Sequence, residues 1–130
     1  MTRASRYVYL ALAWAFLALL VVQVFFAGLG FFVDRGDFGL HVNLGWILHL
    51  LPLLVLAAAA LSRAGRRHWQ WALALAVVVF IVPILATLRG DLPLAAAFHP
   101  VGALLAFWLA LVVARNSLEP IRATPEVPAG

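Results

Sequence analysis

Four apolar stretches alternate with short polar segments along this chain, and each is long enough to cross a bilayer. They cover residues 7–33, 38–61, 69–88 and 92–114. A hydrocarbon core about 30 Å thick takes roughly 20 helical residues, so each stretch predicts one transmembrane helix. The connecting segments are short, which makes consecutive helices antiparallel neighbours. The pattern therefore predicts an all-α polytopic membrane protein, a four-transmembrane-helix bundle of up-down topology.

The polar segments predict where these helices end. Residues 1–6 form a basic leader like that of a signal peptide, but the apolar run that follows exceeds the usual 7–15 or so residues, so we expect a retained first helix. The segment 34–37 reads DRGD, and we expect Asp37 to cap the second helix. Residues 115–130 carry several prolines among mixed charges, which predicts a disordered tail.

Composition supports a membrane environment. Among 130 residues, 66% are hydrophobic and 11% are charged, with a mean hydropathy of +1.07. A typical soluble domain has roughly 25% charged residues, and a single small core could not bury this much apolar surface. Cysteine is absent, which excludes disulfides, thiolate metal sites and a cysteine nucleophile.

The arginines predict the orientation of the chain. One side of the expected bundle carries Arg3, Arg6, Arg63, Arg66, Arg67, Arg115 and Arg122. The other side carries two arginines, Arg35 and Arg89, together with three aspartates. By the positive-inside rule, both termini and the basic loop are cytoplasmic. Because the arginines cluster at helix ends, topology accounts for the positive charge, and we expect no nucleic-acid partner.

Three histidines within the apolar runs are the candidates for chemistry: His41 and His49 in the second run and His99 in the fourth. Eight residues separate the first two, or about 80° and about 12 Å on a helix, so they are poorly placed to share one metal ion. The second and fourth helices of such a bundle face each other diagonally. Two axial imidazoles on opposed helices are what a haem iron needs.

The depth of His99 depends on where its helix begins. If Asp91 caps that helix, His99 lies between His41 and His49 in depth. If Pro100 marks the start instead, His99 matches His41 better. Gly45 and Gly102 lie close in sequence to these histidines, and we expect them to leave space for a flat macrocycle.

Other interpretations use the same residues. Each intramembrane histidine could instead hydrogen-bond Gln23, Asn43 or a carbonyl freed by a proline. The chain could be an accessory subunit that packs in a larger membrane complex, or with a second copy, through Gly28, Gly30 and Gly45. A small-solute carrier working as an oligomer is a third hypothesis. No catalytic motif occurs, so we do not expect an enzyme, and His68 is expected to add only interface charge to the basic loop.

The segments QVFFAGLG, FGLHVNLGWILHLLPLL and FHPVGALLAFWLAL resemble a family of small bacterial four-span membrane proteins, domain of unknown function 6220, over residues 7–114. That resemblance implies the four-helix architecture and a bacterial cytoplasmic membrane. A looser likeness connects the chain to four-helix haem-binding membrane domains, such as the cytochrome b561 type and the halves of haem A synthase. That likeness implies histidine ligands on facing helices, and our hypothesis from these residues is an electron-transfer module that binds haem b or a quinone. One haem, held by His41 or His49 together with His99, is the most that three histidines allow.

Overall fold

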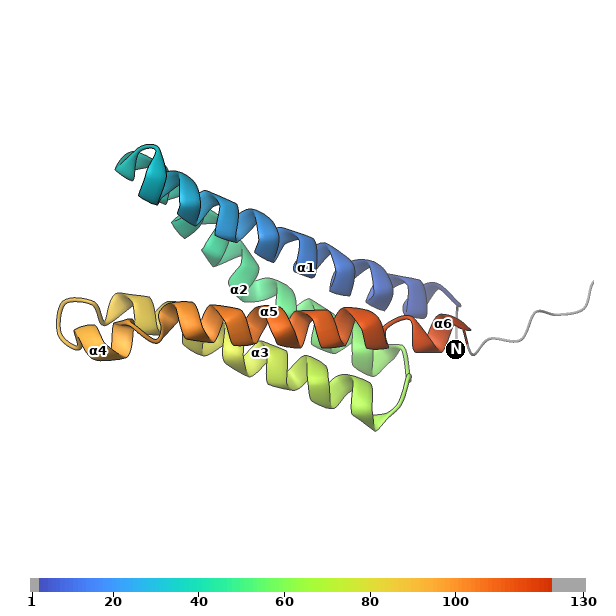
Figure 1. The fold of residues 1–130 in the computed structure, drawn as a ribbon. Coiled ribbons are helices and arrows are strands. Elements are labelled where there is room, and N and C mark those ends of the chain that lie inside the picture. Colours follow the sequence, from blue (N-terminus) through green and yellow to red (C-terminus); the bar gives the residue numbers. More distant parts are fainter. Residues whose placement is uncertain (1–2, 123–130) are drawn as a thin grey trace, which may run out of the picture.

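The computed structural model describes residues 3–122 and is all-α, as the pattern predicts (Figure 1). Its elements are α1 (Arg3–Phe32), the 3-10 turn η1 (Arg35–Asp37), α2 (Phe38–Leu61), α3 (Arg66–Thr87), α4 (Pro93–Ala96), α5 (His99–Asn116) and α6 (Glu119–Arg122). Helix α1 packs against α2 and α5, and α3 packs against the same two helices. The four long helices therefore form a closed ring in which α2 and α5 are diagonal partners.

Four helical segments are long and apolar enough to cross a membrane: Arg3–Phe32, Arg35–Leu61, Arg66–Thr87 and Pro93–Arg122. Large apolar side chains on their outer faces, such as Phe25, Leu50 and Leu104, are more than half exposed. Such surfaces suit lipid, in which helices satisfy their own backbone hydrogen bonds. The chain is thus a multi-pass membrane protein.

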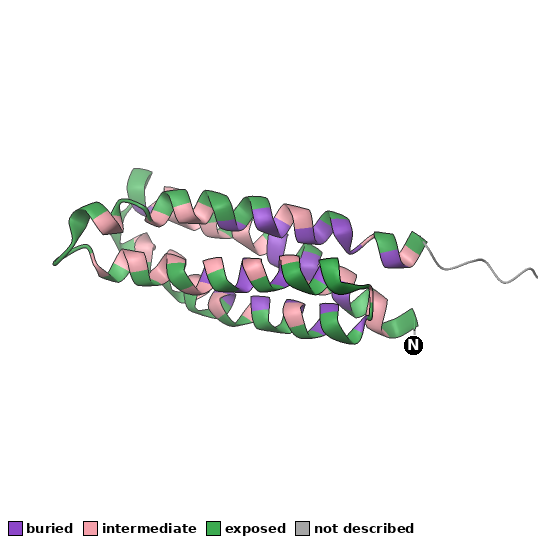
Figure 2. Ribbon diagram, turned by 90° about the horizontal axis from the view of Figure 1, so that it is seen from below, coloured by how far each residue is buried: buried purple, intermediate pink, exposed green. Residues whose placement is uncertain are grey.

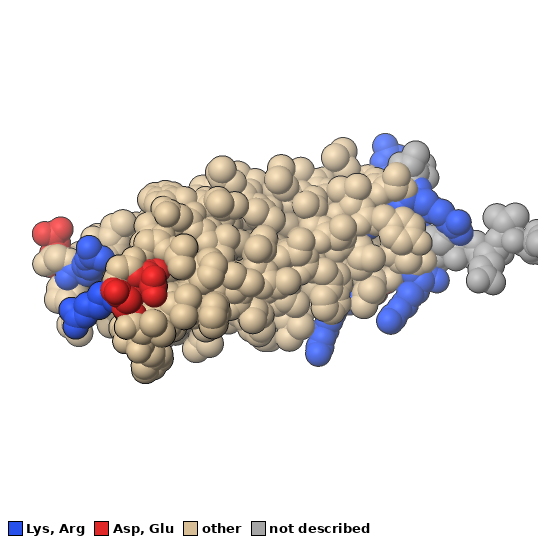
Figure 3. Space-filling view, turned by 90° about the horizontal axis from the view of Figure 1, so that it is seen from above, with Lys and Arg blue, Asp and Glu red and all other residues tan. Residues whose placement is uncertain are grey.

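Charged residues lie at the two ends of the bundle (Figure 3). We call one end the basic end, with Arg3, Arg6, Arg63, Arg66, Arg67, Arg115 and Arg122. We call the other the aspartate end, with Asp34, Arg35, Asp37, Arg89 and Asp91. The middle of the molecule lacks charge on the face shown in Figure 3.

The packed core is concentrated toward the basic end, where Figure 2 shows most of the buried residues. Tyr9, Phe16, Val55, Leu75 and Val113 are almost fully buried there. Alanines from all four long helices, Ala13, Ala59, Ala72 and Ala114 among them, belong to the same core. Small residues let helix backbones approach closely, so this half is tightly closed. Toward the aspartate end, the α1–α2 pair diverges from the α3–α5 pair (Figure 1).

Several predicted boundaries differ from those observed. Helix α1 already begins at Arg3, and α3 begins at Arg66. The fourth apolar run is divided into α4 and α5 at the Phe98–His99 junction, with Pro100 in the first turn of α5. Proline lacks an N–H and is tolerated in a first turn, which explains the division.

The predicted cap and the predicted tail were partly wrong. Asp37 makes no side-chain capping bond, whereas the Asp34 carboxylate accepts a hydrogen bond of 2.7 Å from the backbone N–H of Gly36 and caps η1. The segment after Arg115 remains helical as far as Arg122 with one short turn, and Pro120 is buried. The rest of the predicted tail, 123–130, lies outside the described residues.

Candidate functional site

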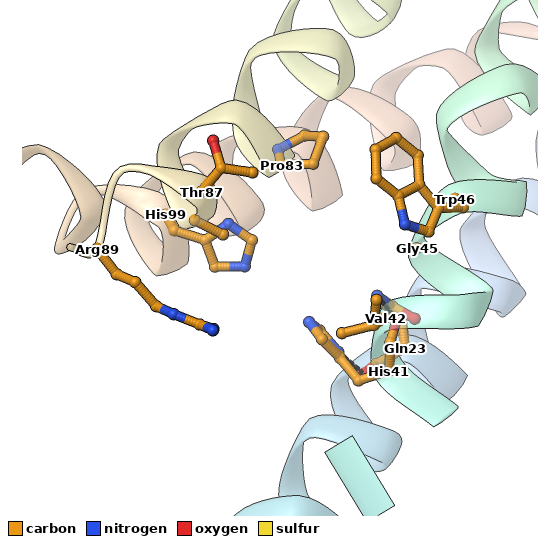
Figure 4. Close-up of a pocket in the computed structure, with 10 residues that line it drawn as sticks. Gln23, His41, Val42, Gly45, Trp46, Pro83, Thr87, Arg89 and His99 are labelled. Atoms are coloured by element: carbon orange, nitrogen blue, oxygen red, sulfur yellow. Dashed lines mark hydrogen bonds between the residues drawn. The ribbon is translucent and has the colours of Figure 1, made fainter. Parts of the chain in front are cut away.

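A cavity of about 460 Å³ lies where the two helix pairs diverge (Figure 4). It is lined by Gln23 of α1, four residues of α2, three of α3, Arg89 of the following turn and His99 of α5. The lining residues of α2 and α3 are His41, Val42, Gly45, Trp46, Pro83, Ala86 and Thr87. Its size falls within the roughly 300–1,000 Å³ of small-molecule sites. Its lining combines apolar residues with five polar or charged ones: Gln23, His41, Thr87, Arg89 and His99.

Two of the three predicted histidines meet at this cavity. The ring centroids of His41 and His99 are 6.3 Å apart, and the ring planes are inclined by 79°. Helix α5 begins at His99, which confirms the alternative in which Pro100 marks the helix start and His99 lies level with His41. In Figure 4 both imidazoles are directed toward the space between the helix pairs.

Each of these imidazoles is fixed to a backbone carbonyl. His41 Nδ1 lies 3.0 Å from the Gln23 carbonyl oxygen, and His99 Nδ1 lies 2.8 Å from that of Val82. A carbonyl oxygen only accepts hydrogen bonds, so Nδ1 must carry the proton in both rings. In a neutral imidazole this leaves Nε2 with a free lone pair, the form that ligates metals.

Gln23 makes two hydrogen bonds to His41, one through its backbone carbonyl and one through its side chain. Its own carbonyl accepts from the His41 ring, and its side-chain Nε2 donates to the His41 carbonyl oxygen over 2.8 Å. Gln23 is therefore a hydrogen-bond partner of His41, as one of the interpretations predicted. A Cβ atom at Gly45 would lie 3.0 Å from Gln23 Nε2, so the glycine leaves room for this amide. The Gln23 Oε1 atom is buried at the cavity without a hydrogen-bond partner among residues 3–122.

The other predicted site residues lie elsewhere. His49 does not line the cavity; its ring packs 4.1 Å from that of Phe80, between centroids. Its Nδ1 is buried with no partner in the described chain. Asn43 is exposed on α2, away from the cavity. Of the two histidines of the second run, it is His41 whose ring lies beside that of His99.

The expected role of Gly102 was wrong. A Cβ atom there would lie 2.8 Å from Val82 Cγ2, so the missing side chain makes room for α3 and leaves no slot beside His99. This contact brings α5 close to α3, and the His99 ring reaches the Val82 carbonyl in the same region. Gly102 thus positions His99 through helix packing.

Arg89 and Thr87 were not predicted as site residues, yet both line the cavity. Arg89 was interpreted as a topological charge only. Arg89 follows the third span, and the second and fourth spans begin on the same side of the membrane. That position was the signal in the sequence that could have placed Arg89 near His41 and His99. Thr87 turns its hydroxyl to the carbonyl of Ile84 at 2.7 Å.

His68 does more than add interface charge. It lies in the first turn of α3, is only 5% exposed, and its Nε2 is 3.5 Å from Glu119 Oε2 of α6. Its ring packs edge-on against Tyr9 of α1 with 6.1 Å between centroids. His68 therefore joins three helices at the basic end, where it was expected to face the interface.

At two of the three glycines proposed as a docking face, other side chains of this protein fill the space beside the glycine. A Cβ atom at Gly30 would lie 2.5 Å from the Phe38 ring, and Gly45 is covered by Gln23. Gly28 alone of the three has open space beside it. The glycines therefore serve mainly the α1–α2 hairpin.

The ligand set of the cavity limits which cofactor it could hold. Within residues 3–122 no cluster of three or more histidine, cysteine or acidic side chains occurs, so a bare metal ion would lack ligands. A haem iron receives four ligands from its own macrocycle and needs two more from protein. The two imidazoles at this cavity fit that requirement.

Comparison with known proteins places the central part of the chain in a family. Residues 23–88, more than half of the sequence, match the model of a family of unknown function, DUF6220. The matched segment holds Gln23, His41 and Gly45 but ends before His99, and it is shorter than the expected 7–114. No curated protein and no solved structure matches the chain. The chain belongs to DUF6220, a family of unknown function.

Proposed function

We propose that this protein is a membrane electron-transfer module that binds one b-type haem between His41 and His99. The observation that carries the proposal is the pair of imidazoles on diagonal helices, 6.3 Å apart between centroids, with both Nδ1 atoms hydrogen-bonded to carbonyls. An imidazole nitrogen lies about 2.0–2.1 Å from a ligated metal, so two rings on opposite sides of one metal have centroids about 6 Å apart. The observed separation agrees with that value.

The surroundings support the same assignment. A carbonyl that accepts from Nδ1 orients a ligating imidazole and raises its basicity. The side chains of Trp46, Pro83 and Ala86 add apolar walls, which lower the dielectric and control solvent access. A bound haem would supply one-electron redox chemistry, whereas this chain would hold, orient and shield it.

The proposed orientation follows from charge. Seven arginines at the basic end favour a cytoplasmic location for that end, with both termini inside, in a bacterial cytoplasmic membrane. The cavity then lies in the outer half of the membrane. A quinone in the lipid is the proposed exchange partner at that depth, because the exposed Val42 and Trp46 at the cavity face lipid.

A cofactor-free accessory subunit, with a larger membrane complex or a second copy as its partner, is the competing proposal, and one observation favours it. Aromatic rings that pack edge to face have centroids about 4.5–7 Å apart, so direct contact between His41 and His99 also satisfies the geometry. In that account the two rings serve only to close the bundle. The two proposals differ in whether a pigment is bound.

The test is a reduced-minus-oxidised absorption spectrum of the protein purified in mild detergent from cells supplied with a haem precursor. The haem proposal predicts the sharp reduced band of a six-coordinate b-type haem, near one haem per chain. A flat spectrum at full haem supply would contradict it and leave the accessory account. Solvent extraction of the same pigment-free sample would then test for bound quinone. Bound quinone would indicate a quinone site, and its absence would leave the account in which the histidines only pack.

A further inference from the structure

We propose that Arg89 is an anion-binding subsite of the cavity and pairs with a carboxylate of the bound tetrapyrrole. This inference rests on the proposed function, and it adds how the cofactor is oriented. Haem b carries two carboxylates on one edge, and that edge would face the aspartate end. Four observations support it: the position of Arg89, its lack of an ion pair, the chemistry of the guanidinium and the contrast with Arg35.

Arg89 lies in the turn that follows α3, at the rim of the cavity. Figure 4 shows its side chain reaching toward the space that His41 and His99 border. It is the single charged residue among those that line this cavity. A cation at this point therefore faces whatever occupies the space between the imidazoles.

The charge of Arg89 is available for a ligand. None of the ion pairs within residues 3–122 includes Arg89, although Asp91 follows it closely in sequence. The Asp34 carboxylate is instead used by the backbone of Gly36. Arg89 is exposed in a turn at the aspartate end, so its guanidinium can reach an anionic group at the rim of the cavity.

A guanidinium suits a carboxylate better than it suits a neutral group. Its planar donors match two carboxylate oxygens at once, and such charge-assisted bonds are about twice as strong as neutral ones. The cavity offers no other cation to a carboxylate. Arg35, the second arginine of this end, does not line the cavity and is therefore a matched control.

The source of the anion could be the tetrapyrrole or the phosphate of a lipid headgroup in the same leaflet. The two share the chemistry that Arg89 would recognise. A tetrapyrrole with esterified carboxylates separates them, because it keeps the macrocycle and iron but loses both negative charges.

The experiment titrates haem b and its dimethyl ester into purified unpigmented wild-type protein, Arg89→Gln and Arg35→Gln in neutral detergent. We expect Arg89→Gln to weaken haem b binding about tenfold, the loss of one charge-assisted hydrogen bond, while Arg35→Gln binds like wild type. The ester should bind wild type and Arg89→Gln with equal affinity, because it offers no carboxylate.

The outcomes that overturn the proposal are distinct. Equal haem b affinity of wild type and Arg89→Gln would overturn the subsite, and so would an equal loss for the ester. Retention of phosphatidylglycerol by wild type but not by Arg89→Gln, with haem b affinity unchanged, would assign Arg89 to a lipid instead. Binding of neither haem b nor its ester to wild type would overturn the proposed function itself.

Discussion

The rings of His41 and His99 lie 6.3 Å apart between centroids with their planes inclined by 79°, yet each ring is anchored within its own helix pair. His41 of α2 is bonded to a carbonyl of α1, and His99 of α5 to a carbonyl of α3. The two halves of the candidate site are therefore built separately, one on each pair. They come together only when α1–α2 and α3–α5 pack at the basic end.

The side chain of Gln23 should matter for how His41 is held. Gln23→Leu keeps the volume but removes the hydrogen bond from Nε2 to the His41 carbonyl. We expect haem affinity to fall by up to about tenfold, as for other residues that orient a ligand. Titration of haem into the purified variant measures this. Asn43→Leu is the control, because it removes an exposed amide of the same helix, and an equal effect of both changes would argue against a positioning role.

Replacement of Gly45 by alanine should disturb its surroundings, whereas replacement of Gly39 should not. Gly45→Ala places Cβ 3.0 Å from Gln23 Nε2, so the amide must shift and the bond to His41 weakens. Gly39→Ala adds the same methyl to the same helix with nothing within 4 Å. Both gain about 1 kcal/mol of helix propensity. We expect Gly39→Ala to raise the melting temperature in detergent and Gly45→Ala to show less gain and weaker haem binding; identical behaviour would contradict the packing argument.

The α1–α2 turn should depend on Gly30. Alanine there would put Cβ 2.5 Å from the Phe38 ring, and that ring also packs against Phe31. Overpacking of this kind typically costs about 1–3 kcal/mol. Thermal unfolding in detergent should show Gly30→Ala destabilised and Gly28→Ala as stable as wild type or up to about 1 kcal/mol more stable, since Gly28 has open space and alanine favours the helix. Loss of stability in Gly28→Ala alone would instead point to a partner that covers that face.

Contact between Glu119 and His68 should help hold the short helix α6 against the basic end. The Glu119 side chain is half exposed, so Glu119→Gln should cost no more than about 1 kcal/mol. We expect faster trypsin cleavage after Arg115 or Arg122 and no change at the distant cavity. Cleavage at the wild-type rate would show that Arg6, which donates to the Pro120 carbonyl over 2.7 Å, holds this segment without help from His68.

Hydrophobic patterning predicts the architecture of this protein well because lipid imposes few alternatives. Runs of about 20 apolar residues must be helices, and short loops leave antiparallel packing. The sequence left two levels open for His99, and the structure agrees with the one in which Pro100 lies in the first turn of its helix, where proline is tolerated. The diagonal relation of the second and fourth helices follows from the same topology.

The details of the site depend on rotations and divergence of the helices, which sequence does not encode locally. His49 lies two turns beyond His41, yet it packs on Phe80. Gly102 and Gly45 both neighbour a histidine in space or sequence, but their absent side chains make room for Val82 and Gln23. Arg89 reaches the cavity because the helix pairs diverge at this end.

The central claim is that His41 and His99 together ligate one haem. The most direct measurement is the absorption spectrum of haem titrated into purified wild type and into His41→Ala, His99→Ala and His49→Ala, each checked for intact helicity. The account predicts that wild type and His49→Ala give the spectrum of a six-coordinate haem at one per chain, whereas both other variants lose it. A six-coordinate spectrum that survives in His41→Ala or His99→Ala, or disappears in His49→Ala alone, would contradict the account.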